Sequence, residues 1–214
     1  MRRRTSSQRR LPRLAGDDGA VMVEFALAAP LLAVLMLGTL EFGMAWRETN
    51  FIERSVQGAG RVASNLGDDM TADAAALRSL DASLDTLKRA SVDRVVIFES
   101  TTADGKVPDN CKNADTSGTA PFGVSGSCNV YTAAQAESAT FSGLTMAQVE
   151  ARTDCAGDWD GNWCPNVRSS LINNPDHIGV WVRIDYERFT GLISGSFTIE
   201  RTAVYQLEPE FELP

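Results

Sequence analysis

The chain has 214 residues, of which 43% are hydrophobic and 22% are charged, and its formal net charge is -8. This composition permits a folded core and excludes disorder of the whole chain. Beyond residue 13 the acidic residues outnumber the basic ones two to one, which disfavours electrostatic binding to DNA, RNA or anionic lipid head groups. Proteins are therefore the expected partners, and nucleic acid is not.

The first 13 residues form a basic leader that contains no acidic residue. Its six arginines are Arg2, Arg3, Arg4, Arg9, Arg10 and Arg13. Lys and Arg that precede an apolar segment hold that end of the chain on the cytoplasmic side of a membrane. We therefore predict a cytoplasmic leader over residues 1–19 and an extracytoplasmic domain over residues 47–214.

Residues 20–46 are predicted to be a transmembrane helix of the cytoplasmic (inner) membrane. The uncharged stretch from Phe25 to Leu40 is 16 residues long, slightly short of the roughly 20 that span a bilayer core. Apolar neighbours extend it, and Trp46 and Arg47 suit the outer interface. A cleavable signal peptide is the alternative, but the apolar residues continue well past Pro30, so a retained anchor is favoured.

Two helices are expected to follow outside the membrane. The first continues the span from Glu48 to Leu66, with apolar residues mostly at three- to four-residue steps, and Gly67-Asp68-Asp69 ends it. The second runs from Ala72 to about Ala90 with Thr71 as its N-cap. Its stripe of leucines needs a sheet or another helix to cover it.

Three strands are predicted, over Arg94–Glu99, Gly179–Glu187 and Ser196–Leu207. The last two alternate well and are expected to form a hairpin across Gly191 and Gly195. In the second strand, Val180, Val182, Ile184 and Tyr186 are expected on the buried face, and Trp181, Arg183, Asp185 and Glu187 on the solvated face.

The predicted fold is therefore α+β, with a long N-terminal transmembrane helix and a second helix packed on a small antiparallel sheet. Residues 100–176 show little periodicity apart from a short helix around Thr145 to Arg152. We expect them to form a loop-rich insertion pinned by disulfides.

All four cysteines, Cys111, Cys128, Cys155 and Cys164, lie in this insertion. If the domain is exported, two disulfides are expected. Three pairings are possible, and proximity favours Cys111 with Cys128 and Cys155 with Cys164. A zinc site is the alternative, but CxxC spacing is missing and His177 is the only histidine, so no metal is expected.

An acidic loop within the insertion suggests a calcium site, because carboxylates around a tight turn suit a hard cation. Its residues are Asp154, Asp158, Asp160, Gly161 and Asn162. The spacing does not fit an EF-hand loop, whose first and last positions would be Ala156 and Val167. An acidic turn inside the Cys155 to Cys164 loop is therefore preferred, with Trp159 and Trp163 as core residues.

Catalytic machinery is not evident in the sequence. His177 has no context that suggests a triad, and GVSGS around Ser125 lacks the strand-to-helix setting of a nucleophile elbow. We therefore expect a protein that is not an enzyme and needs no cofactor.

The most specific local pattern is GAVMVEF, in which Gly19 ends the polar leader and Glu24 stands fifth after it inside an apolar helix. A carboxylate inside a membrane is costly and is a functional hypothesis by default. The pattern resembles the type IV prepilin class signal. The longer string GAVMVEFALAAPLLAVLMLGTLEFG is similar to the N-terminal domain of the TadE/TadF family of minor pseudopilins from tight-adherence (Flp) pilus systems. This resemblance is close over roughly residues 16–50 and weaker in the C-terminal hairpin.

The resemblance implies that a prepilin peptidase cleaves between Gly19 and Ala20. Glu24 would then be the fifth residue of the mature chain, and its carboxylate would pair with the new amine of the same or a neighbouring subunit. Phe25 stands where Flp major pilins usually have tyrosine, which together with the large exported part indicates a minor component. The alternative for Glu24 is a solvated position at the cytoplasmic interface.

The resemblance also implies a structural role in pilus assembly, with partners in the membrane, in other pilin-like subunits and in pilus assembly proteins. The alternative is an unprocessed single-pass protein whose extracytoplasmic domain binds a ligand or another protein.

Overall fold

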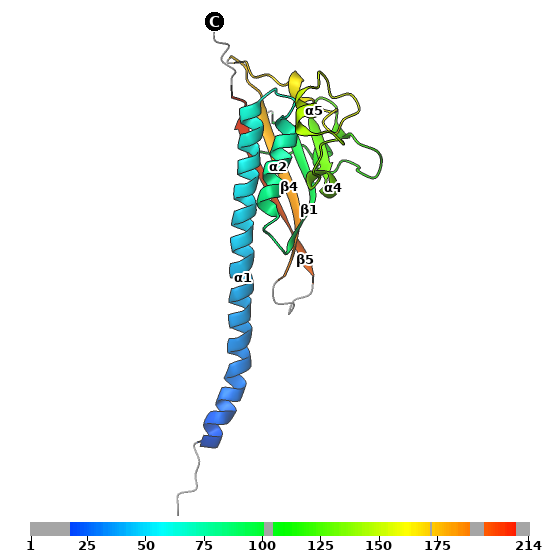
Figure 1. Cartoon of the computed structure of the whole chain (residues 1–214). Coiled ribbons are helices and arrows are strands. Elements are labelled where there is room, and N and C mark those ends of the chain that lie inside the picture. The colour runs from blue at the N-terminus through cyan, green and yellow to red at the C-terminus, as the bar shows by residue number, and fades with distance from the viewer. Residues whose placement is uncertain (1–17, 101–104, 172, 189–194, 209–214) are drawn as a thin grey trace, which may run out of the picture. The chain divides into compact units, whose positions relative to one another are not determined.

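A computed structural model describes residues 18–100, 105–171, 173–188 and 195–208 (Figure 1). It divides into two units, residues 1–43 and residues 44–214, which are considered separately. The helices are α1 (Asp18–Leu66), α2 (Ala72–Leu84), α3 (Asp109–Lys112), α4 (Ala133–Ala136), α5 (Met146–Glu150) and the 3-10 turn η1 (Pro165–Val167). The strands are β1 (Ala90–Glu99), β2 (Phe122–Val124), β3 (Cys128–Thr132), β4 (His177–Glu187) and β5 (Ser196–Gln206).

Helix α1 is continuous from Asp18 to Leu66, which confirms that the predicted apolar helix extends far beyond the apolar stretch. It ends where the sequence indicates: Gly67 has a φ of 58°, and its N–H donates to the carbonyl of Ala63 at 3.1 Å. Glycine adopts this left-handed conformation without steric cost, so it terminates the helix cleanly.

The sheet has five antiparallel strands in the order β2-β3-β1-β4-β5. Strands β4 and β5 pair along their full length, from His177 opposite Gln206 to Glu187 opposite Ser196, so the predicted hairpin is confirmed. Gly191, expected in its loop, lies outside the described residues. Strand β1 occupies the centre of the sheet, between β3 and β4.

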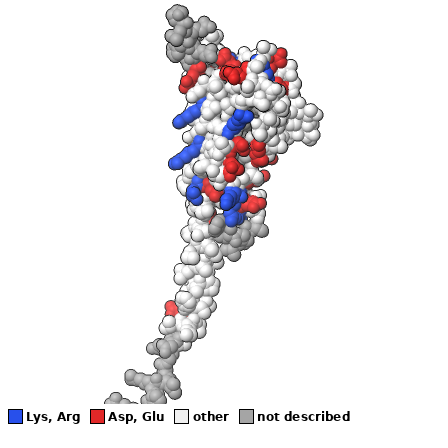
Figure 2. All heavy atoms as spheres, viewed as in Figure 1, with Lys and Arg blue, Asp and Glu red and all other residues white. Residues whose placement is uncertain are grey.

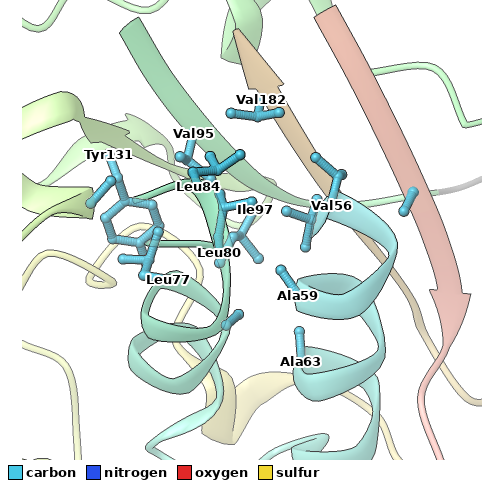
Figure 3. Close-up of a cluster of buried hydrophobic side chains, with 14 of the residues drawn as sticks. Val56, Ala59, Ala63, Leu77, Leu80, Leu84, Val95, Ile97, Tyr131 and Val182 are labelled. Carbon is cyan, nitrogen blue, oxygen red and sulfur yellow. The ribbon is translucent and has the colours of Figure 1, made fainter. Parts of the chain in front are cut away.

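Within the second unit, α2 and the C-terminal part of α1 cover one face of this sheet (Figure 3). Figure 3 shows Val56, Ala59 and Ala63 of α1 and Leu77, Leu80 and Leu84 of α2 gathered against Val95, Ile97, Tyr131 and Val182 of the strands. All ten are buried. The leucine stripe of α2 is therefore covered by α1 and the sheet together, as its amphipathic pattern requires.

Small residues let α1 approach strand β5 closely. A Cβ atom placed on Gly60 would lie 2.9 Å from the ring of Tyr205, and 3.4 Å from the Cβ of Ala203. The hydroxyl of Ser64 donates to the carbonyl of Gln206 at 2.5 Å, one turn further along the helix. Glycine is unfavourable inside a helix by about 1 kcal/mol, so its presence at position 60 is explained by this contact.

The second face of the sheet is covered only in part. Asp185 and Glu187 are exposed on it, as predicted, but the expectation fails for Trp181. Trp181 is 2% exposed and packs in a second cluster with Val96, Phe98 and Val130. The cover comes from the Cys111–Cys128 disulfide, because both cysteines are fully buried in the same cluster. The prediction of a solvated face was wrong for Trp181 because the cover comes from a distant part of the chain.

Helix α2 is shorter than predicted, ending at Leu84 and not near Ala90. Ala90 already belongs to β1, where it lies opposite Tyr186 of β4, so backbone pairing overrides the helical pattern there. Thr71 stands at the N-cap position but makes no capping bond, because its hydroxyl donates to the side chain of Asp69.

Residues 100–176 are less loop-like than predicted. They contribute β2 and β3, and β3 pairs directly with the central strand β1 from Arg94 opposite Thr132 to Phe98 opposite Cys128. Helix α5 lies within the range predicted for a short helix. The two strands escaped detection because they are only three and five residues long, too short for alternation to show.

Candidate functional site

The N-terminal residues singled out from the sequence lie in the first turns of α1, in the first unit of the chain. Gly19 is the second residue of the helix, followed directly by Ala20. Glu24 and Phe25 are exposed, and 69% of Phe25 is accessible.

Helical spacing places Ala20 and Glu24 on one face of α1, since they are four residues apart. An amine on Ala20 would therefore lie within one turn of the Glu24 carboxylate. The same exposure leaves this carboxylate accessible to the amine of a second molecule. The geometry accommodates both forms of the pairing implied by the prepilin resemblance.

The rest of this unit presents an apolar surface. Among the residues described, α1 is the one helix long and apolar enough to cross a membrane, judged by length and composition. Figure 2 shows almost no charged side chain along this part of the helix. Pro30 lies inside it, where its missing N–H leaves the carbonyl of Ala26 without its usual helical partner. The single N-terminal apolar helix indicates a membrane-anchored protein.

Comparison with known families agrees with this reading. Residues 19–61 match the TadE-like protein family. The match confirms the resemblance seen in the sequence, and it includes Gly19, Glu24 and the whole apolar stretch. No curated protein and no solved structure matches the chain. We call residues 19–61 the TadE-like segment; strands β1–β5 all lie outside it.

The cysteines pair outside the TadE-like segment. Cys111 is bonded to Cys128 with a Cα–Cα distance of 6.1 Å, and Cys155 to Cys164 with a Cα–Cα distance of 5.7 Å. This is the pairing that sequence proximity favours. The first bond joins α3 to the start of β3, and the second closes the acidic loop.

Arg152 occupies the centre of the acidic loop, where the sequence had suggested a cation. Its guanidinium donates to Asp158 at 2.8 Å and to both carboxylate oxygens of Asp160 at 2.8 and 2.9 Å. It also donates to the carbonyl of Met70 at 2.9 Å. Within the described part of the chain, no group of three or more His, Cys, Asp or Glu is arranged to hold a metal ion.

Burial raises the pKa of Asp160, and the hydrogen bond from Arg152 only partly offsets this effect. Burial likewise raises the pKa of Tyr131 well above its ordinary value, and the neighbouring Asp73 carboxylate raises it further. The Tyr131 hydroxyl therefore stays protonated and serves as a hydrogen-bond donor. These shifts belong to groups that are enclosed by protein, and neither group is open to solvent.

A buried ion pair between Asp73 and Arg168 lies beside this loop and was not detected from the sequence. Both side chains are fully buried, and Arg168 Nη2 is 2.7 Å from Asp73 Oδ1. Tyr131 and Asn129 donate to Asp73 Oδ2 at 2.6 and 2.9 Å. The Arg168 guanidinium also lies 4.2 Å from the ring centre of Trp163. The pair links the start of α2 to β3 and to the residues that follow η1.

Sequence proximity alone gives no signal for this pair, since 95 residues separate its members. The one available clue is an aspartate at the second position of a helix that is otherwise rich in alanine and leucine. Such an aspartate is usually explained by its favourable interaction with the helix N-terminus.

Ser125 lies in a turn, and His177 is the first residue of a strand. Ser125 is exposed in the turn between β2 and β3, which is a hairpin and not a strand-to-helix turn. His177 begins β4, and its carbonyl accepts a hydrogen bond from the N–H of Ser100 at 2.7 Å.

Proposed function

We propose that this protein is a minor pseudopilin-like component of a tight-adherence (Flp, type IV-like) pilus or a related secretion system, acting in pilus assembly. One observation carries the proposal. The TadE-like segment combines Gly19, Glu24 and a single apolar helix, and that helix continues into a separately folded α+β domain. A subunit of this kind packs its helix among other pilin-like helices and presents its domain to assembly proteins.

In this proposal the N-terminus lies in the cytoplasm, α1 crosses the cytoplasmic (inner) membrane, and the domain is outside. A prepilin peptidase removes residues 1–19, and Glu24 then pairs with the amine of Ala20 on its own or a neighbouring subunit. The pairing is favourable because a lone carboxylate and a lone amine are each costly in lipid, and each compensates the charge of the other.

The proposed role is structural and requires no cofactor. Among the described residues, the carboxylates of Asp73 and Asp160 are fully buried, and each forms an ion pair with an arginine. Partners other than proteins and the membrane are not part of the proposal, and nucleic acid is not expected to bind.

The intact mass of the membrane-extracted chain tests the proposal. A mature chain that begins at Ala20 supports it, whereas a chain that retains Met1 supports the alternative, an unprocessed single-pass protein with a ligand-binding domain. We expect Gly19→Leu to block leader removal, because the peptidase must approach this backbone closely and glycine has no side chain in the way. Gly38→Leu, in the same helix beyond the cleavage site, is the matched control and should be processed normally. Equal processing of Gly19→Leu and wild type would contradict the cleavage assignment.

The orientation is tested through the cysteines. In an exported, oxidised domain all four cysteines are disulfide-bonded, so they should resist alkylation in intact, non-reduced cells and react after reduction in denaturant. Ala139→Cys supplies an exposed thiol on the domain as a positive control for a reagent that cannot cross the inner membrane. Native cysteines that react in the cytoplasm without reduction would overturn the orientation and the pseudopilin role together.

A further inference from the structure

A cavity of about 670 Å³ opens between α1 and the turn that connects α2 to β1. It lies entirely within the second unit of the chain. The side chains that matter for its chemistry are Trp46, Arg47, Glu48, Phe51, Arg54 and Leu87. Its volume falls in the range of about 300–1,000 Å³ that small-molecule sites occupy.

Two arginines of this cavity have no partner for their charge among the residues that the structure describes. Arg47 and Arg54 are both exposed, and neither side chain forms an ion pair or a hydrogen bond with any residue that the structure describes. They are seven residues apart in α1, so they lie on one face about 10 Å apart along the helix axis. Figure 2 shows basic side chains in a row over this part of the molecule. Two unpaired guanidinium groups on one wall favour a phosphate, which accepts paired hydrogen bonds from them.

A third unpartnered group lines the same cavity. Glu48 Oε2 is buried and has no hydrogen-bond partner among the described residues. Buried polar atoms of this kind normally find a partner, because leaving them unpaired is costly. A carboxylate oxygen requires a donor, and an ammonium group supplies one. The cavity thus offers complementary partners for a phosphate and for an amine within one ligand.

The aromatic and aliphatic residues of the cavity and its place in the chain indicate where such a ligand comes from. Trp46 and Arg47 directly follow the apolar part of α1, at the position where a membrane-spanning helix meets the interface. Trp46, Phe51 and Leu87 supply apolar surface suited to the carbon atoms of a head group.

We propose that this cavity binds the phosphoethanolamine head group of a phospholipid, with Arg47 and Arg54 on the phosphate and Glu48 on the ammonium. The proposal rests on the membrane anchoring of the chain and not on its role in a pilus. Binding would tether this part of the chain to a phospholipid head group.

The test is lipid retention by the purified full-length chain, measured by native mass spectrometry with phospholipids of identical acyl chains. We expect ethanolamine lipid to be retained roughly five- to tenfold more than choline lipid, because a trimethylated nitrogen cannot donate a hydrogen bond to Glu48. Arg54→Gln should lower the retention of both lipids, and Glu48→Gln should remove the preference for ethanolamine.

Arg61→Gln is the matched control, since Arg61 lies on the same helix one heptad beyond Arg54 and does not line the cavity. Its lipid retention should equal that of the wild type. Equal retention of the two lipids by the wild type, or identical behaviour of Arg54→Gln and Arg61→Gln, would overturn the proposal. Displacement of the lipid by millimolar inorganic phosphate would identify a site for a soluble anion and would overturn the lipid assignment. If Glu48→Gln does not fold, the lipid retention of Arg54→Gln compared with that of Arg61→Gln still tests the proposal, because Arg54 is exposed and its replacement should not affect folding.

Discussion

Replacing Arg168 with methionine is expected to lower the free energy of unfolding by about 3–5 kcal/mol, because it leaves the Asp73 carboxylate buried without a compensating charge. Tyr131 and Asn129 still donate to that carboxylate, but neutral donors do not replace a cation. For a domain of this size the change corresponds to a fall of roughly 10 °C in the midpoint of thermal unfolding. Near-ultraviolet circular dichroism of the full-length protein in detergent would measure it.

Arg78→Met is the matched control, since Arg78 is an exposed arginine on α2. Its effect should stay within about 0.5–1 kcal/mol, as for other surface substitutions. Adding Asp73→Asn to Arg168→Met should recover part of the loss, because asparagine keeps an acceptor for Tyr131 and removes the uncompensated charge. A double variant less stable than Arg168→Met, or a single variant as stable as Arg78→Met, would show that the ion pair does not hold these elements together.

Replacing Glu24 with alanine is expected to leave membrane insertion intact and to remove the chain from assembled pili. Insertion is preserved because the substitution makes α1 more apolar. Assembly is impaired because the amine of Ala20 loses its partner, which costs about 2–3 kcal/mol in lipid and corresponds to roughly thirtyfold or more in incorporation. Quantitative immunoblots of membranes and of sheared pili, with the variant as the only copy, would measure both quantities.

The matched control is Glu41→Ala, which removes the other acidic residue of the apolar segment. It should assemble at close to the wild-type level, since position 41 is about six turns away from the mature N-terminus. Normal pili with Glu24→Ala would assign Glu24 to a solvated position at the interface. Equal loss with both variants would point to a general effect of charge in the helix and not to pairing with the amine.

The elements with strong, local patterns were predicted well. Helix α1 was predicted from the apolar run and from the three- to four-residue periodicity that follows it. Its end was predicted from the glycine at position 67. Strands β4 and β5 were found because strict alternation persists over many residues. These signals need no knowledge of distant contacts, since each arises from the spacing of side chains along one element.

The errors occur where distant residues decide the environment. The boundary between α2 and β1 depends on pairing with β4, and the burial of Trp181 depends on a disulfide that covers the second face of the sheet. Strand β3 is five residues long and includes Cys128, so a stretch predicted as loop is a strand beside the centre of the sheet.

The sequence by itself determined that this chain has a single apolar helix preceded by arginines, a Gly19 and Glu24 pattern at the head of that helix, and four cysteines in one region. Each of these is a property of residue type and spacing. Tertiary structure alone decided which charges are buried together. Arg152 and Asp160 are eight residues apart in the sequence, whereas Arg168 and Asp73 are 95 residues apart and are brought into contact by the fold. Such pairs form only after the sheet and the helices have excluded water from both partners, so local sequence carries almost no signal for them.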